Sequence, residues 1–61
     1  MTINEFIRYL KKQGIKFKEH GTKHDVYYNP KTGDIAQIPR YQSQEIKEGT
    51  KDSILKDLGL K

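Results

Sequence analysis

Cysteine is absent from this sequence, and so is any long apolar run. Without cysteine, neither a disulfide framework nor a thiolate metal site is possible, and a reducing cytosol is the default expectation. No apolar stretch approaches the ~18 residues of a membrane span, and the start lacks the basic-then-apolar pattern of a secretory signal. We therefore expect a soluble, cytoplasmic protein.

The chain is also short and basic. Its 61 residues are expected to form one domain over 1–61, which buries only ~60% of the unfolded chain's surface and leaves no room for a deep cleft. Twelve Lys and Arg residues against eight Asp and Glu residues give a net charge of +4. This excess either favours a polyanionic partner, nucleic acid or an acidic protein surface, or serves only solubility.

A first helix is predicted over 2–14, TINEFIRYLKKQG. Thr2 can cap the first turn while Glu5 reaches back to the amide of the cap residue. Gly14 can adopt the left-handed conformation that ends a helix. The apolar residues follow helical spacing and form one stripe: Ile3, Phe6, Ile7 and Leu10.

A second helix is predicted at the other end of the chain, in TKDSILKDLGLK. Thr50 is the expected N-cap, and Gly59 is the expected stop. The residues expected on its buried face are Ile54, Leu55 and Leu58.

Between the helices the spacing of apolar residues changes to the alternation of strands. Three strands are predicted over 15–20, 24–29 and 34–39, separated by the turn sequences GTK and PKTG. Pro39 ends the third strand, and an irregular connection follows with one helical turn around Glu45. The predicted class is α+β, a helix, a three-stranded antiparallel sheet and a helix, with both helices on one face of the sheet.

Alternation along the first strand predicts which side chains face the helices. Ile15 and Phe17 are expected in the core, which sends Lys16, Lys18 and His20 to the opposite face. In the third strand, the residues expected to face inward are Ala36 and Ile38.

The second strand is ambiguous by itself, and the register of the first hairpin decides its orientation. A loop of only GTK would give three facing pairs: His20 with His24, Lys18 with Val26, and Lys16 with Tyr28. Tyr27 then points into the core. The open face collects basic and aromatic side chains, as a nucleic-acid surface requires: Lys16, Lys18, His20, His24 and Tyr28, with Lys23 at the tip.

His24 allows several interpretations. Two histidines separated by three residues match no closed set of metal ligands, so we expect neither a metal nor another cofactor. A serine or cysteine nucleophile system lacks its parts. Acid–base cleavage of RNA needs less, because the substrate brings its own 2′-hydroxyl nucleophile and the protein supplies a proton carrier and cations. Alternatively, His24 is only a polar turn residue.

Five segments together resemble the HicA family of type II toxins, which are small messenger-RNA interferases. They are GTKH followed by YYNP, then IPRY, EIKEGT and SILKDLGL, after the capped first helix. The resemblance runs from Thr2 to Leu60 in order and at compatible spacing. It implies a fold like that of double-stranded-RNA-binding domains (dsRBD-like), with the helix, three strands and helix already predicted.

The resemblance also implies an activity and a catalytic residue. The family's catalytic histidine follows a Gly-Ser/Thr turn at the start of the second strand, and the matching position is His24. The implied activity is metal-independent endonuclease action on messenger RNA, restrained by a cognate HicB-like antitoxin protein that covers the active face. Many members carry a histidine after the Pro-Arg pair, where this chain has Tyr41.

Further roles are predicted around His24. Gly21 and Thr22 shape the active-site turn and offer amides to phosphate. The residues expected to hold the RNA backbone are Lys16, Lys18 and Lys23. Tyr28 stacks on a base or orients the phosphate, and Arg40 either contacts RNA or meets acidic antitoxin residues. His20 is a candidate second acid/base through its expected pairing with His24.

Two other functions remain open at the level of sequence. One is a non-catalytic RNA-binding module of the same fold, in which His24 contacts a phosphate or a base. The other is a basic interaction protein for an acidic partner, without RNA binding. A steep dependence of affinity on salt would distinguish RNA binding from the second alternative.

Overall fold

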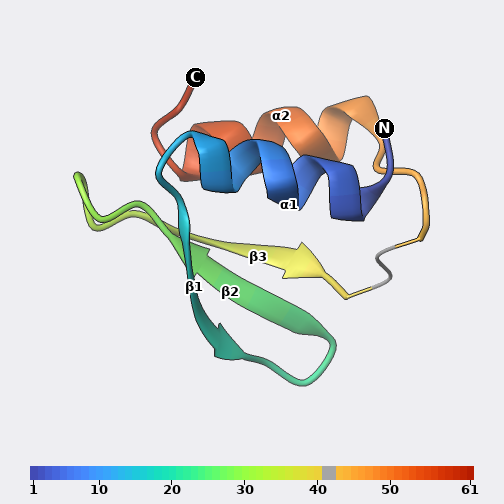
Figure 1. Ribbon diagram of the computed structural model, residues 1–61, viewed down its shortest axis with the longest axis horizontal. Helices are drawn as coiled ribbons and strands as arrows, with labels where there is room; N and C mark the ends of the chain where they lie inside the picture. Colours follow the sequence, from blue (N-terminus) through green and yellow to red (C-terminus); the bar gives the residue numbers. More distant parts are fainter. Residues whose placement is uncertain (41–42) are drawn as a thin grey trace.

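The computed structural model describes residues 1–40 and 43–61. Its elements follow the predicted order (Figure 1): α1 (Ile3–Lys12), β1 (Lys16–His20), β2 (His24–Tyr28), β3 (Ile35–Pro39) and α2 (Glu48–Asp57). Tyr41 and its neighbour Gln42 lie outside the described residues. Within the described ranges, neither helix has the length and apolar character needed to cross a bilayer.

The first helix begins and ends as predicted. The Thr2 amide donates to Glu5 Oε1 at 2.8 Å and the Glu5 amide donates to Thr2 Oγ1 at 3.2 Å, which completes a capping box. Gly14 has a φ of 88°, and the amide of Ile15 then donates to the carbonyl of Leu10 at 3.0 Å. The chain thereby turns directly from α1 into β1.

The second helix begins earlier than predicted. Lys47 is the N-cap, so Thr50 lies inside the first turn and the prediction of a Thr50 cap was wrong. The reason is tertiary: the Ile46 amide donates to the Met1 carbonyl at 3.0 Å, which sets the chain direction before the helix. Glu45 pairs with Thr2 in an isolated antiparallel bridge, so the helical turn expected around Glu45 was also wrong.

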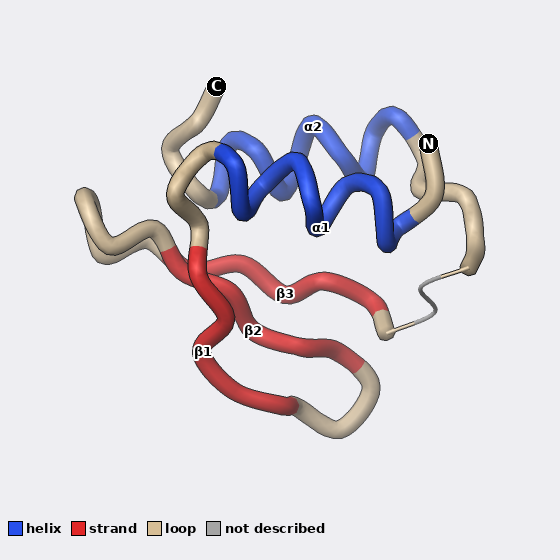
Figure 2. The backbone as a smooth tube through the Cα atoms, viewed as in Figure 1, coloured by secondary structure: helices blue, strands red, loops and turns tan. Residues whose placement is uncertain are grey.

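The three strands form one antiparallel sheet in the order β1-β2-β3, and both helices lie on the same side of it (Figures 1 and 2). This confirms the predicted fold class. Tyr27 faces Ala36 and Asp25 faces Ile38 across β2 and β3. The core lies between helices and sheet and contains Ile3, Phe6, Ile7, Leu10, Ile15, Tyr27, Ala36, Ile38, Ile46, Ile54 and Leu58.

The register of β1 against β2 differs from the prediction at the loop end. Lys16 faces Tyr28 as expected, but the register shifts between Phe17 and Glu19. Beyond this bulge Glu19 faces Val26 and His20 faces Asp25, so the predicted pairs of Lys18 with Val26 and of His20 with His24 were wrong. One extra residue moves every later side chain of the strand to the other face.

Phe17 was expected in the core and is 42% exposed. Its ring packs edge-on against Tyr27, with 5.6 Å between the ring centroids. All five residues of β1 are exposed, and Figure 2 shows that the end of β1 and the loop after it lie away from the layer of helices. Phe17 therefore covers the rim of the core instead of filling it.

Candidate active site

His24 is the first residue of β2, and it is half-buried on the face of the sheet turned away from the helices. Asp25 and Tyr27 are buried on the helix side. Because neighbouring residues of a strand alternate, His24 and Tyr28 point to the other side, which we call the open face. The predicted orientation of β2 is therefore confirmed.

His24 is one of the residues that line an open pocket of about 440 Å³. Its lining residues are Gly21, Thr22, Lys23, His24, Val26 and Gln37. Gln37 was not predicted as a site residue, although the inward positions Ala36 and Ile38 already implied that Gln37 points outward. The pocket combines an imidazole, an ammonium group and a carboxamide, which can respectively move a proton, attract a phosphate and hydrogen-bond a nucleotide.

The loop before His24, residues 21–23, is tightly closed at Gly21. The Gly21 amide donates to the His24 carbonyl at 2.7 Å. A Cβ atom at Gly21 would lie only 2.6 Å from that carbonyl oxygen, so any larger residue would force the backbone apart. The predicted role of Gly21 in shaping the turn thus has a steric basis, and Thr22 and Lys23 are exposed at the loop tip.

Arg40 and His20 meet at the Asp25 carboxylate. Asp25 Oδ1 accepts from His20 Nδ1 at 2.8 Å and from Arg40 Nε at 2.8 Å. Arg40 Nη2 also donates to the Gly21 carbonyl. The guanidinium thus joins the residue after β3 to β2 and to the residue after β1. Sequence reasoning missed Asp25, because its partners lie in β1 and directly after β3.

The electrostatics of this group follow from its contacts. The hydrogen bond from His20, reinforced by the one from Arg40, lowers the pKa of the Asp25 carboxyl below its ordinary value although burial acts in the opposite direction. The Asp25 side chain is 11% exposed, so the carboxylate is held as an anion in a largely dry position. Burial and the Asp25 charge raise the pKa of the neighbouring Tyr27.

His20 does not share the open face with His24. It faces Asp25 across the hairpin, and its ring lies against Phe17 with 4.8 Å between centroids. His20 and His24 therefore point to opposite faces of the sheet. The predicted pairing of His20 with His24 was wrong, because the bulge in β1 places His20 opposite Asp25.

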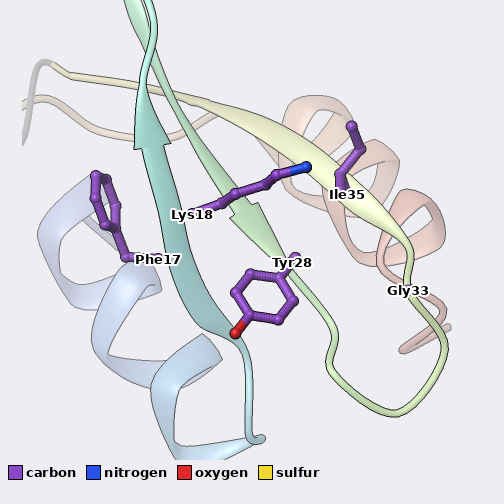
Figure 3. A pocket seen from close by; sticks show the side chains of 5 residues that line it. All are labelled: Phe17, Lys18, Tyr28, Gly33 and Ile35. Atoms are coloured by element: carbon purple, nitrogen blue, oxygen red, sulfur yellow. The ribbon is translucent and has the colours of Figure 1, made fainter.

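The other predicted RNA-binding residues gather at the opposite end of the open face. Lys18 and Tyr28 line a second open pocket, of about 500 Å³, together with Phe17, Gly33 and Ile35. In Figure 3, the Lys18 side chain extends across β2 beside Tyr28 and toward Ile35, and the Phe17 ring lies on the other side of β1. Lys16 faces Tyr28 and is exposed.

The open face therefore carries two groups of predicted residues. His24 and the 21–23 loop form one group, and Lys16, Lys18 and Tyr28 form the other. The two ends of β2 are four residues apart, or about 13 Å at ~3.3 Å per residue. Among residues 1–40 and 43–61, no three His, Asp or Glu side chains converge as a metal site requires.

Comparison with known proteins identifies the family. The protein-family model described as the HicA toxin of bacterial toxin–antitoxin matches residues 3–60 of the chain. The chain belongs to the HicA toxin family. This confirms the resemblance drawn from the sequence motifs.

Similar HicA proteins match over their whole length. The chain is 44% identical over 62 residues to the probable mRNA interferase HicA 2 of Photorhabdus laumondii, covering 100% of both chains. It is 39% identical to the probable mRNA interferase HicA of Pseudomonas fluorescens, covering 100% of this chain and 98% of that protein.

A solved structure also matches the fold of this HicA chain. It is the crystal structure of the E. coli HicAB toxin–antitoxin complex, with a TM-score of 0.83 and 36% sequence identity. The match covers 95% of this chain and 96% of that chain.

Proposed function

We propose that this HicA protein is the toxin of a type II toxin–antitoxin system and a metal-independent endoribonuclease that cleaves messenger RNA. The similar proteins named probable mRNA interferase support the activity. The observation that carries the assignment to a residue is the position of His24, half-buried in an open pocket beside a lysine and a loop that only glycine can close.

His24 is the proposed proton carrier. The neutral imidazole removes the proton of a ribose 2′-hydroxyl, and the oxygen attacks the adjacent phosphorus. The bond from phosphorus to the 5′ oxygen of the next nucleotide breaks and leaves a 2′,3′-cyclic phosphate. The proton taken up by His24 returns to the leaving 5′ oxygen, directly or through water, so the step balances without a metal.

The 21–23 loop and three lysines are proposed to bind the phosphates. Lys23 lies in the same pocket as His24 and is the nearest cation to the cleaved phosphate in this assignment. Of the two loop amides predicted to bind phosphate, that of Thr22 keeps this proposed role, because the Gly21 amide already donates to the His24 carbonyl at 2.7 Å. Lys16 and Lys18 hold the backbone farther along the open face, where Tyr28 offers a ring to a base.

The proposed protein partner is a HicB-like antitoxin that covers the open face. Support comes from the similar structure, which is that of a toxin–antitoxin complex. Covering the open face would block both groups of residues from RNA at once. This explains restraint of the toxin without any change in its fold.

The test is cleavage of a long transcript in EDTA by the wild type and by His24→Ala. His20→Ala is the matched control, because His20 and His24 are the two histidines of the chain. Loss of an acid–base catalyst should lower the rate by roughly 10²- to 10⁴-fold. The mapped ends should be a cyclic or 3′ phosphate and a 5′ hydroxyl.

The control also tests the predicted role of His20. Because His20 points to the opposite face, we expect His20→Ala to retain its cleavage rate, which would remove His20 as the second acid/base. If the wild type binds RNA with a steep salt dependence but leaves it intact, the chain is an RNA-binding module. If it neither binds nor cuts RNA, its basic face serves an acidic protein only.

A further inference from the structure

The contacts of Arg40 differ from those expected of a phosphate-binding residue. Its Nε donates to Asp25 Oδ1 at 2.8 Å and its Nη2 donates to the Gly21 carbonyl. One planar group thus satisfies two acceptors on two different segments. The guanidinium presents these two donors from different nitrogens in a fixed planar arrangement, which the single nitrogen of a lysine does not reproduce.

The acceptor of this contact lies behind the active site. Asp25 directly follows His24 in β2, so its carboxylate points to the face opposite the imidazole. Its side chain is 11% exposed, and it faces the fully buried Ile38. The Arg40–Asp25 pair is therefore anchored on the helix side of the sheet, away from RNA on the open face.

The second contact of Arg40 acts on the loop that carries His24. Gly21 accepts from Arg40 through its carbonyl and donates through its amide to the His24 carbonyl at 2.7 Å. A continuous chain of contacts thus runs from Asp25 through Arg40 and Gly21 to the His24 backbone. It ties together the chain segments after β1 and β3 at the start of β2.

We propose that Arg40 and Asp25 are positioning residues, which brace the 21–23 loop from behind and hold His24 in its working orientation. This proposal rests on the proposed function for its kinetic consequences. It gives Arg40 a role different from the predicted contact with RNA or antitoxin. His20 also donates to Asp25, but its side chain is 71% exposed, so the bracing role is assigned to Arg40 and Asp25 alone.

The kinetic test compares Arg40→Lys and Asp25→Ala with the wild type. A loosened brace misplaces the imidazole, so kcat should fall by about tenfold to a hundredfold in both variants while KM stays unchanged. The matched control is Arg8→Lys, because Arg8 is exposed on α1 and is the other arginine of the chain. Thermal melting should first establish that each variant is folded.

The two variants also separate the brace from a phosphate contact. If Arg40 bound phosphate, Arg40→Lys would weaken RNA binding and raise KM while kcat stayed near the wild-type value, the reverse of what the brace predicts. Removal of the nearby negative charge in Asp25→Ala would then strengthen RNA binding. Wild-type kcat in Arg40→Lys, or faster cleavage by Asp25→Ala, would overturn the proposal.

A second readout does not depend on RNA cleavage. Hydrogen exchange at the Gly21 amide should accelerate in Arg40→Lys and in Asp25→Ala, while exchange at Ile38 in β3 remains as in the wild type. Unchanged exchange at Gly21 in both variants would overturn the brace. If the wild type cuts no RNA, the proposed function fails, and the exchange measurement still decides whether the brace exists.

Discussion

The two loops that flank β2 are stabilised in different ways. The 29–34 loop satisfies its own polar groups: the amides of Lys31 and Asp34 donate to the side chains of Asn29 and Thr32 at 3.0 and 3.2 Å. Thr32 Oγ1 also donates to Asp34 at 2.8 Å. This loop is thus held largely by residues within itself.

The 21–23 loop depends instead on residues outside it. Arg40 arrives from the end of β3 and Asp25 from β2, and both lie beyond the loop itself. The loop tip is left exposed beside His24. The comparison shows that the 29–34 loop is stabilised mainly by its own side chains, whereas the 21–23 loop leaves its tip exposed and is held by contacts from outside the loop.

The largest difference between the loops is expected in the cleavage rates of Gly21→Ala and Gly33→Ala. A Cβ at Gly21 meets the His24 carbonyl at 2.6 Å, so the loop must open and cleavage should fall by about a hundredfold. A Cβ at Gly33 would meet no atom, but the φ of this residue is 80°, so Gly33→Ala should lower the free energy of unfolding by about 1–2 kcal/mol. Its cleavage rate should fall much less than that of Gly21→Ala. Cleavage rates and thermal melts check this pair. Equal losses of activity would remove the distinction between the loops.

A smaller effect, on stability, is expected for Asn29→Ala in the second loop. Buried Asn29 donates to the Leu58 carbonyl at 2.8 Å and so attaches the loop to the end of α2. Its loss should lower the free energy of unfolding by about 1–3 kcal/mol. Urea unfolding measures the change, with Asn4→Ala in α1 as the control. A drop in kcat of the folded variant would contradict a purely structural role.

Acid should weaken the first loop through Asp25. Because the folded-state pKa of Asp25 is lowered, its contribution to stability is present above its unfolded pKa of about 3.9 and is lost as the pH falls through the folded value. Thermal melts between neutral pH and acid should therefore show a shallower acid decline for Asp25→Asn than for the wild type. Asp57→Asn, at an exposed position, is the control. Parallel curves for wild type and Asp25→Asn would refute this linkage.

The smallest effect is expected from single lysines at the two loops. Lys23→Gln removes a proposed phosphate contact, so the slope of log affinity for RNA against log salt should decrease by about 0.7. Lys31→Gln, in the 29–34 loop, should leave the slope as it is. Binding titrations at several salt concentrations measure both. Equal slopes for the two variants would place RNA elsewhere on the protein.

Local sequence patterns predicted most of the fold. The capping box of Thr2 and Glu5, and the glycine at position 14, act over only a few residues, so they are readable in the sequence. The same holds for Gly59, after which the Leu60 amide donates to the Leu55 carbonyl at 2.8 Å. The start of α2 was missed, because it depends on contact with Met1.

The candidate site was predictable in part. His24 was selected from its turn and family motif, and alternation around the buried Tyr27 agrees with its place on the open face. Gln37 could have been selected by the same alternation in β3. The position of His20 could not, since one bulged residue reverses the face of all that follows.

The sequence by itself determined the capped first helix and the three strands, because each depends on spacing or turn chemistry within a short segment. Only the tertiary structure decided that Arg40, Asp25 and His20 meet. Their contacts join three strands through a register that contains a bulge. Long-range contacts of this kind depend on how strands are paired, and pairing is settled by the packing of the whole sheet against its helices.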